Sequence, residues 1–420
     1  MIKTLASHLT AIVFIALISI TAHAQACPLL PGCLDPTFGT GGKVTIQFLS
    51  SPDDRPMDMV VLPDGKILEL IYRNRFVRLN ADGTLDQTFG SGGVANFVWP
   101  ATPGQEGYAN GYAMRLQDVG GGLRIVVAGK RRLVSGRNFV DVLQVGRFML
   151  DGTVDASFGT GGTVLINAAT FANEMEIQAD GKIVILDGAG KVVRTNANGS
   201  LDTGFGSGGI VNTGFNNDVA IDGNGGILVG DTITTGNGKN TKMSLAVKRY
   251  TSSGAADPAF GTAGTATADF GAKSAQFGKL AIDPFGNIVA AGGAVAPGNG
   301  QYYLAAARFT SNGIADPFFG AAGKVKFVGA SGMGNRGVLI QADGKVVLTG
   351  QLNGDYGLVR YNYDGTLDTA FGNGGNVIED VDLTDFVDTW IMQMDPGCAC
   401  SKIVMSSHGL GLSFARFTVQ

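Results

Sequence analysis

Acidic side chains offer most of the chemistry in this sequence, because histidine is almost absent. Of the three histidines in 420 residues, His8 and His23 lie in an N-terminal segment that we expect to be removed, which leaves His408. The sequence contains no paired-histidine metal motif, no histidine-assisted nucleophile set and no Gly-x-Ser-x-Gly turn. Acid–base catalysis by aspartates that converge in space is the mechanism that the composition leaves open.

Aspartate-rich turns are the candidates for metal binding. The closest match to a calcium loop is Asp222-Gly223-Asn224-Gly225-Gly226. This stretch lacks the density of acidic ligands and the closing glutamate of such a loop. Asx turns, in which the aspartate side chain bonds nearby backbone, explain the same residues. We therefore expect no bound metal and no cofactor.

An arginine recurs along the chain with an aspartate eight residues later, at the start of a variant of Asp-x-x-Phe-Gly. The pairs are Arg78 with Asp86, Arg147 with Asp155, Arg194 with Asp202, Arg249 with Asp257, Arg308 with Asp316 and Arg360 with Asp368. Asp35 and Arg416 complete a seventh pair only if the two ends of the chain meet. Because a guanidinium can hold a turn by charge-assisted hydrogen bonds to a carboxylate, we interpret these residues as structural.

The motifs define an internal repeat. They begin at positions 35, 86, 155, 202, 257, 316 and 368, and each continues into Phe-Gly. A repeat of about 50 residues is typical of proteins built from one supersecondary unit that packs against its neighbours. The 65 glycines, with 45% hydrophobic and 16% charged residues, fit many short strands joined by tight turns.

One unit shows the expected strands most clearly, at 324–328, 337–340, 346–349 and 358–361. The strand after each Asp-Gly turn is a continuous apolar run, which indicates burial on both faces. We therefore predict an all-β fold, a seven-bladed β-propeller of four-stranded antiparallel blades, whose ring is closed by joining the N- and C-terminal segments. A parallel β-helix is the alternative, but its strands would not be joined by Asp-Gly hairpin turns.

In an antiparallel blade, successive connections between strands alternate between the two ends of the sheet, so the loops lie on two opposite faces of the propeller. The Asp-x-x-Phe-Gly and Asp-Gly turns share one face, here called the regular-turn face. The opposite, irregular-loop face carries the loops at 98–112, 130–137, 232–241 and 298–303. Candidate ligand-binding residues on this rim are Trp99, Tyr108, Tyr112, Arg131, Arg132, Tyr302 and Tyr303. The same aromatic rings could instead pack against their own loops.

The N-terminus resembles a secretory signal peptide. Lys3 precedes an apolar stretch at 9–20 and a small-x-small site ends at Ala24. We expect a signal peptide at 1–24, one propeller domain at 25–420, and an exported protein that is extracellular, on the cell surface or periplasmic. The apolar stretch is short for a membrane anchor, and acylation at Cys27 is a less favoured alternative.

All four cysteines lie near the chain ends, at Cys27, Cys33, Cys398 and Cys400. In an oxidising compartment they predict one or two disulfides that lock the ring. A local bridge between Cys398 and Cys400, or free thiols, are the alternatives. The net charge of -4 favours neither nucleic acid nor an anionic membrane as partner, and we expect no stable membrane insertion and a monomer.

The string from Arg360 to Gly375, with turns like that at 341–345, resembles the delta-60 repeat family of bacterial proteins. The resemblance covers 34–420 and implies an exported bacterial β-propeller of largely uncharacterised function, often attached to other surface modules. It implies no catalytic residues. Ala263 and Ala322 depart from the family pattern, because glycine stands there in the other units. We expect a propeller without an appended module.

These observations favour a non-catalytic binding or scaffold module for a protein or glycan, acting through the irregular-loop face. The alternative is a propeller hydrolase or lyase that uses carboxylates in the channel. A cluster of Asp or Arg in the channel, not paired within a turn, would favour the enzyme. A channel lined by small apolar residues would exclude it.

Overall fold

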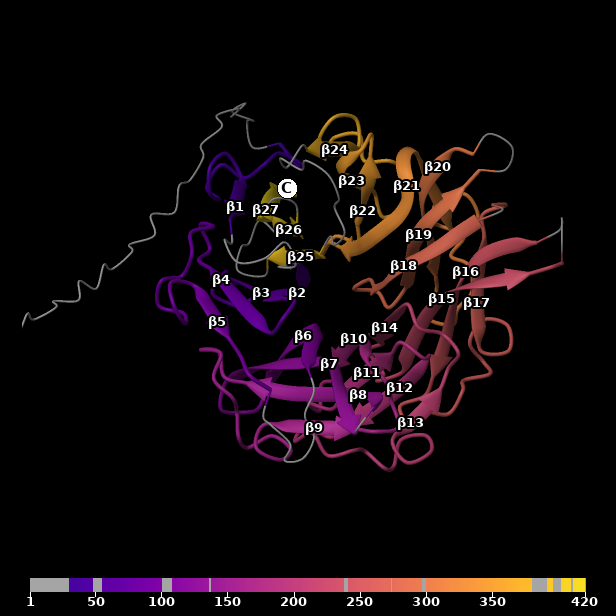
Figure 1. Cartoon of the computed structure of the whole chain (residues 1–420). Coiled ribbons are helices and arrows are strands. Elements are labelled where there is room, and N and C mark those ends of the chain that lie inside the picture. Colours follow the sequence, from indigo (N-terminus) through magenta and orange to yellow (C-terminus); the bar gives the residue numbers. More distant parts are fainter. Residues whose placement is uncertain are drawn as a thin grey trace, which may run out of the picture.

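The computed structural model describes residues 30–47, 55–99, 108–135, 137–237, 241–272, 274–296, 300–379, 391–395, 402–408 and 411–419. These residues form strands and turns, and no helix occurs among them. The sheets follow one another around a central space in the order of the chain (Figure 1).

Five sheets contain four antiparallel strands each. They are β2 (Pro56–Val61), β3 (Ile67–Ile71), β4 (Arg75–Leu79) and β5 (Val94–Asn96); β6 (Ala109–Asp118), β7 (Leu123–Ser135), β8 (Asn138–Phe148) and β9 (Thr163–Ile166); β10 (Ala172–Ile177), β11 (Ile183–Asp187), β12 (Lys191–Thr195) and β13 (Ile210–Asn212); β14 (Asp218–Ile221), β15 (Ile227–Thr235), β16 (Lys242–Tyr250) and β17 (Thr265–Asp269); and β1 (Lys43–Ile46), β27 (Leu412–Thr418), β26 (Lys402–His408) and β25 (Ile391–Asp395).

The sixth sheet has seven strands. They are β18 (Ser274–Ile282), β19 (Ile288–Val295), β20 (Tyr302–Phe309), β21 (Lys324–Ile340), β22 (Val346–Leu352), β23 (Asp355–Tyr361) and β24 (Asn376–Glu379), in that order across the sheet.

The prediction of seven four-stranded blades is wrong. The structure has five four-stranded blades, and its remaining seven strands form one sheet. The 17-residue strand β21 pairs with β20 through its first part and with β22 through its last part, and Ala330 lies opposite both Tyr302 and Leu352. The segment 329–336, which has no proline, therefore continues the strand where the sequence predicted a connection between 324–328 and 337–340.

The two ends of the described chain meet in one sheet. Strand β1 pairs antiparallel with β27, with Lys43 opposite Ala415 and Ile46 opposite Leu412 (Figure 1). The strands behind the innermost ones are buried along their whole length, as β3 and β11 show, because each sheet is covered by a neighbour on both faces. This confirms the burial that the continuous apolar runs predicted.

The Phe-Gly glycines connect adjacent units on the regular-turn face. The N–H of Gly39 donates to the carbonyl of Asp82 at 2.7 Å, and the N–H of Gly320 donates to that of Asp364 at 2.8 Å. Gly39 has a φ of 54°, and a Cβ there would lie 2.2 Å from the carbonyl oxygen of Lys43. Only glycine therefore fits this link between units.

Candidate functional site

The repeated arginines hold the turns of the regular-turn face. In each pair the guanidinium bonds its own aspartate, as in Arg360, whose Nε lies 2.8 Å from Oδ2 of Asp368. Nη1 reaches a carbonyl in the next unit, as from Arg78 to Leu150 at 2.8 Å. The aspartate partners of Arg78, Arg147, Arg194, Arg249, Arg308, Arg360 and Arg416 are Asp86, Asp155, Asp202, Asp257, Asp316, Asp368 and Asp35. The repeated arginines and aspartates therefore hydrogen-bond to one another and to backbone of the propeller, as the structural interpretation predicted.

The electrostatics of the pairs agree with this role. Burial would raise the pKa of Asp35, but hydrogen bonds from Lys402 and Thr37 and the charge of Arg416 lower it to about 2. Asp35 therefore stays ionised over the neutral range and keeps its partners.

A second set of charged side chains belongs to the strands that line the central channel. They are Asp58 on β2, Arg115 on β6, Glu174 and Glu176 on β10, Asp218 on β14 and Lys279 on β18. These five strands face the centre of the ring in Figure 1. The strand register shifts immediately before Asp58, Glu174 and Lys279. Because a bulge re-aims the side chains beside it, these shifts help to place charged residues at the channel.

Arg115 and Lys279 join the carboxylates into one network. Nη1 of Arg115 lies 2.8 Å from Oδ2 of Asp58, and its Nη2 lies 2.9 Å from Oε1 of Glu176 and 3.8 Å from Oε2 of Glu174. Nζ of Lys279 bonds Oε1 of Glu174 and lies 3.2 Å from Oδ1 of Asp218. Two cations thus serve four carboxyl groups.

Two of these carboxyl groups also bind backbone of the adjacent sheet. Oδ2 of Asp58 accepts the N–H of Met114 at 2.7 Å, and Oδ2 of Asp218 accepts the N–H of Leu280 at 2.6 Å. Asp58 and Asp218 are buried, whereas the side chains of Glu176 and Lys279 are each 32% exposed. The network therefore has an anchored part and a part that a ligand can reach.

Burial shifts the proton equilibria of the anchored carboxyls. It raises the pKa of Asp218 to about 7, against the opposing charge of Lys279. It also raises the pKa of Asp58, although Arg115 opposes it. On β3 burial raises the pKa of Glu69 well above its usual value, while the Ser406 hydroxyl donates to its Oε1 at 2.8 Å. The channel wall thus holds at least one carboxyl group, that of Asp218, able to take up a proton near neutral pH.

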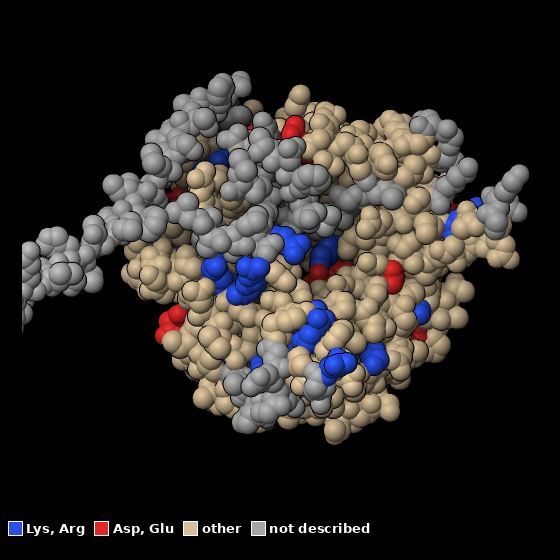
Figure 2. All heavy atoms as spheres, viewed as in Figure 1, with Lys and Arg blue, Asp and Glu red and all other residues tan. Residues whose placement is uncertain are grey.

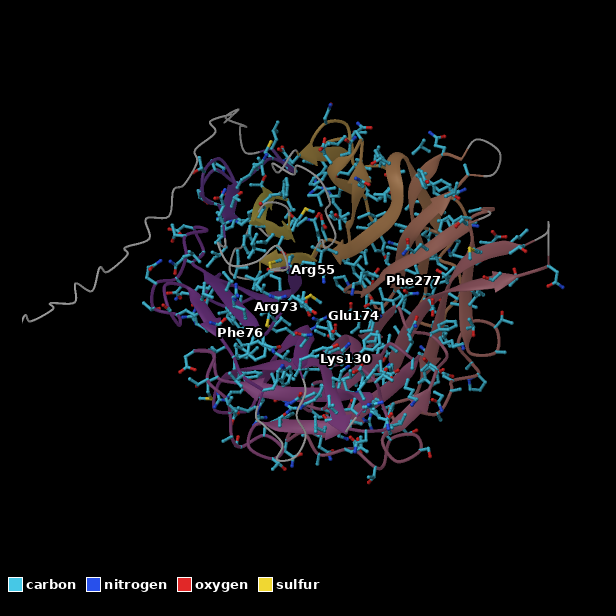
Figure 3. All side chains as sticks on the ribbon, viewed as in Figure 1. Arg55, Arg73, Phe76, Lys130, Glu174 and Phe277 are labelled. Atoms are coloured by element: carbon cyan, nitrogen blue, oxygen red, sulfur yellow. The ribbon has the colours of Figure 1, made fainter. Side chains whose placement is uncertain are left out.

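Basic side chains gather around the mouth of the channel on the irregular-loop face. Figure 3 places Arg55, Arg73 and Lys130 along one side of the central opening, with Glu174 beside them. Arg73 is at the turn between β3 and β4, where its φ of 69° belongs to the left-handed region. Figure 2 shows Lys and Arg around the central hollow and acidic side chains within it. Among the described residues, the part of the mouth that these three side chains occupy is basic, although Lys130 lies 3.4 Å from Oδ2 of Asp141, and the channel wall is mixed in charge.

Two of the predicted rim aromatics do not face solvent. Trp99 is 4% exposed, its indole N–H donates to Oδ1 of Asn74 at 2.8 Å, and its ring meets Phe97 edge-on. Tyr303 is also 4% exposed. These two rings pack into the core beneath their loops, which is the alternative that the sequence left open. Arg131 is likewise buried.

The other rim candidates remain accessible. Tyr108 is 47% and Tyr302 is 38% exposed, and the half-buried ring of Tyr112 meets Phe171 edge-on. The guanidinium of Arg132 lies 4.9 Å from the ring centre of Tyr108 and 4.3 Å from that of Phe139. Rings stacked on an arginine form a ridge of the composition that protein interfaces favour.

The charged channel residues are not among the site residues predicted from the sequence. A signal for them was present in the repeats: Asp58, Glu174, Asp218 and Lys279 each stand six residues before the equivalent turn residues Asp64, Asp180, Asn224 and Phe285. Four units therefore place a charge at the same position of the innermost strand. Aligning the repeats at this position, where a core residue is expected, would have revealed the site.

A family model described as "Domain of unknown function (DUF5122) beta-propeller" matches residues 71–89, 178–205 and 341–371. Each match spans an Asp-Gly turn and an Arg–Asp–Phe motif. The chain is a β-propeller. This propeller is also similar to a solved structure described as "YCF48 bound to D1 peptide", with a TM-score of 0.46 and 10% identity over 93% of this chain and 98% of the other. No curated protein matches the propeller in sequence.

Several sequence predictions fall outside the described residues. The signal peptide at 1–24 and the residues Cys27, Cys398 and Cys400 are among them, so the disulfide lock stays a prediction. Across the described ranges no group of three or more His, Cys, Asp or Glu side chains is arranged to hold a metal ion. In the same part of the chain no helix is long and apolar enough to cross a membrane.

Proposed function

We propose that this β-propeller is a binding or scaffold module that receives an acidic segment of a partner protein at the mouth of its central channel. The observation that carries this proposal is the group formed by Arg55, Arg73 and Lys130 along one side of an opening whose wall carries partly exposed charges (Figures 2 and 3). The chain has a net charge of -4, so this basic mouth is a local feature rather than a result of composition.

The fold itself gives no reason for charges in the channel. The Arg–Asp pairs on the regular-turn face already connect the units, and buried ion pairs contribute little net stability compared with well-packed apolar side chains. Charged groups that line a concave site on a rigid scaffold are typical of recognition sites. We therefore assign the channel wall and mouth to ligand binding.

A protein partner is favoured over a glycan. Trp99 and Tyr303, the rings that suited sugar stacking, are buried. The accessible ridge of Tyr108, Arg132 and Phe139 instead combines aromatic and guanidinium groups, which are enriched at the centres of protein interfaces. We also propose that the protein acts after export, on the basis of the N-terminal segment 1–24.

The test uses fluorescein-labelled hexaglutamate and hexalysine as probes in fluorescence anisotropy at low and high salt. We expect hexaglutamate to bind, with an affinity that falls as salt rises, and hexalysine not to bind. The triple variant Arg55→Ser, Arg73→Ser, Lys130→Ser should weaken binding by about tenfold or more. The matched control Lys242→Ser removes an exposed cation of β16, away from the channel strands, and should leave binding unchanged. Equal binding by the triple variant would contradict the proposal.

The channel also supports a second candidate function. The cluster of carboxyl groups with Arg115, drawn from several strands rather than from one turn, is the feature that would favour a hydrolase or lyase. Binding is favoured because Asp58 and Asp218, the wall carboxyls with raised pKa, are buried and bonded to backbone N–H groups. Turnover of chromogenic glycosides or esters that disappears in a folded Asp218→Asn variant would reverse this preference.

A further inference from the structure

One part of the regular-turn face departs from the repeat pattern. Four turn positions of the seven-stranded sheet carry large hydrophobic residues, at Phe285, Ile314, Phe318 and Tyr363. Most equivalent residues in other units are small or polar. Phe285 stands where other units have Asp64, Asp180, Asn224 and Asp343, and Ile314 stands where they have Thr84, Thr153, Ser200, Ala255 and Thr366. Phe318 is equivalent to Thr37, Thr88, Ser157, Gly204, Ala259 and Ala370, and Tyr363 is equivalent to Ala81, Leu150, Ala197, Ser252 and Ser311. The fold forms elsewhere without these side chains.

The four residues, here called the turn patch, gather around Arg308. The rings of Phe285 and Tyr363 meet edge-on with centres 5.2 Å apart. The guanidinium of Arg308 lies 4.2 Å from the ring centre of Tyr363, and its Nη1 donates to the Tyr363 carbonyl at 2.5 Å. Ile314 and Phe318 flank Asp316, the carboxylate partner of Arg308, in the same turn. The departures from the repeat are therefore adjacent in space.

The substitution at Phe318 removes a favourable contact. In two equivalent units a hydroxyl accepts from the arginine Nη2, from Arg147 to Ser157 at 3.0 Å and from Arg416 to Thr37 at 3.1 Å. In the turn patch Phe318 has no hydroxyl, and Nη2 of Arg308 is buried without a hydrogen-bond partner. A buried guanidinium nitrogen left unpaired costs stability. Gly204, Ala259 and Ala370 lack the hydroxyl as well, so what distinguishes Phe318 from the other units is its large exposed ring.

The four side chains of the turn patch are exposed and uncharged. Phe285 is 65%, Ile314 57%, Phe318 78% and Tyr363 38% exposed. Ser311, Asn312, Pro317 and Ala321 beside them are uncharged, but two exposed carboxylates border the turn patch: Asp364 follows Tyr363, and Asp343 precedes Gly344, which lies against the rings of Tyr363 and Phe285. Exposed apolar groups that are contiguous mark interaction sites.

The exposed area of the turn patch indicates what kind of partner can bind it. At these exposures four such side chains present roughly 400 to 500 Å², from 150–250 Å² for a whole aromatic side chain. A stable complex of two globular surfaces buries about 800 Å² on each partner, so the turn patch is too small for a second copy of this chain. A short segment of another protein that inserts one or two bulky apolar side chains fits this area.

We propose that the turn patch is a second docking site, which binds a short apolar segment of a partner protein on the face opposite the channel mouth. It differs from the proposed site on the irregular-loop face in position and in chemistry. Because the four side chains themselves carry no charge, its affinity depends less on salt than that of the channel mouth. The protein then connects two ligands, one on each face of the ring.

The experiment is selection from a displayed library of random 12-residue peptides on the mature protein, with counter-selection on a repeat-restoring variant. That variant is Phe285→Asp, Ile314→Thr, Phe318→Thr, and each new residue is the one other units carry. We expect selected peptides with bulky apolar anchors to bind the wild type about 30-fold more tightly than the variant. High salt should change their affinity less than twofold, on the same reasoning. The control Val328→Thr, an exposed apolar residue of β21, should bind like the wild type.

Three results would overturn the proposal. The first is a selection that yields no peptide able to distinguish the wild type from the repeat-restoring variant. The second is a dimer by light scattering that becomes a monomer in that variant, because the turn patch would then join two copies of the chain. The third is sedimentation with neutral phosphatidylcholine vesicles that the variant abolishes, which would indicate a lipid surface. Hexaglutamate binding is unaffected by these outcomes, so failure here is separable from failure of the channel site.

Discussion

Nε of Arg416 lies 2.7 Å from Oδ2 of Asp35, which joins two residues separated by 381 positions in the chain. The same guanidinium reaches the carbonyl of Ala81 and the hydroxyl of Thr37, and its carboxylate partner also bonds Lys402 at 2.7 Å. This contact between the two ends of the chain has the same geometry as the six Arg–Asp pairs that are local in sequence. It therefore closes the ring with the same interaction that holds each turn.

Loss of this closing contact should destabilise the whole domain. We expect Arg416→Met to lower the free energy of unfolding by about 3 kcal/mol, because it leaves a buried carboxylate with one cation fewer. Arg249→Met is the matched control, since that arginine side chain is 16% exposed against 4% for Arg416. Urea unfolding of both variants measures the difference. An equal or larger loss in Arg249→Met would show that closure has no special weight.

Stability should depend on pH in both directions from a slightly acidic optimum. The pKa of Asp218 is raised from 3.8 to about 7 by burial, so its folded form binds a proton more tightly and stability falls as pH rises between these values. The pKa of Asp35 is lowered from 3.8 to about 2, so its contribution is lost as pH falls through that range. We expect the highest melting temperature near pH 4 to 5, from these windows.

Thermal unfolding monitored by circular dichroism from pH 2 to 9 tests this dependence. The variant Asp218→Asn should flatten the decline between pH 4 and 7, because its side chain does not titrate. It should leave the acid limb unchanged, since that limb belongs to the Arg–Asp pairs. A melting temperature that rises from pH 5 to 7 would contradict the assignment of raised pKa values to the channel.

Two alanines of the repeat have backbone strain that glycine would relieve. Ala263 and Ala322 have φ values of 51° and 53°, where other units have glycine at positive φ. The left-handed region costs an L-residue roughly 1 kcal/mol, so Ala263→Gly and Ala322→Gly should each raise the free energy of unfolding by about that amount. The control Ala321→Gly, at an exposed residue next to Ala322, should instead lower it. If the denaturant midpoints of Ala321→Gly and Ala322→Gly shift in the same direction by the same amount, Ala322 has no backbone strain that glycine relieves.

The sequence predicted the repeat, the all-β propeller and the meeting of the ends, because Arg78 and its equivalents recur at fixed spacing. It did not predict the continuous strand β21. The glycines between 329 and 336 are typical of a loop, and the pairing of Ala330 with both Tyr302 and Leu352 arises only when the neighbouring strands are in place. Strand boundaries of this kind depend on tertiary context.

The channel network was missed for a similar reason. Asp58 and Lys279 are 221 positions apart, and the opposite charges nearest to them in sequence, Arg55 and Asp283, are not the groups that the fold brings to them. Their connection through Arg115 and Glu174 exists only after the sheets are arranged around the axis. The exposure of the rim aromatics was mispredicted for a different reason. Trp99 was assigned to a loop surface, but its ring is large enough to fill the space beside Phe97 and Phe148.

Restoring the repeat residue at Phe318 should stabilise the fold while it weakens the turn patch. In Phe318→Thr the new hydroxyl can accept a hydrogen bond from the unpaired Nη2 of Arg308 and donate one to the Asp316 carboxylate. Thr37 makes the same two hydrogen bonds with Arg416 and Asp35. A hydrogen bond to a buried charged group is worth about 1 to 2 kcal/mol. We expect the free energy of unfolding to rise by roughly that amount in Phe318→Thr and to rise less in Phe318→Ala, which removes the ring without supplying the hydroxyl. If urea unfolding shows both variants to be less stable than the wild type, the ring of Phe318 stabilises the fold, and its conflict with the repeat needs no docking partner.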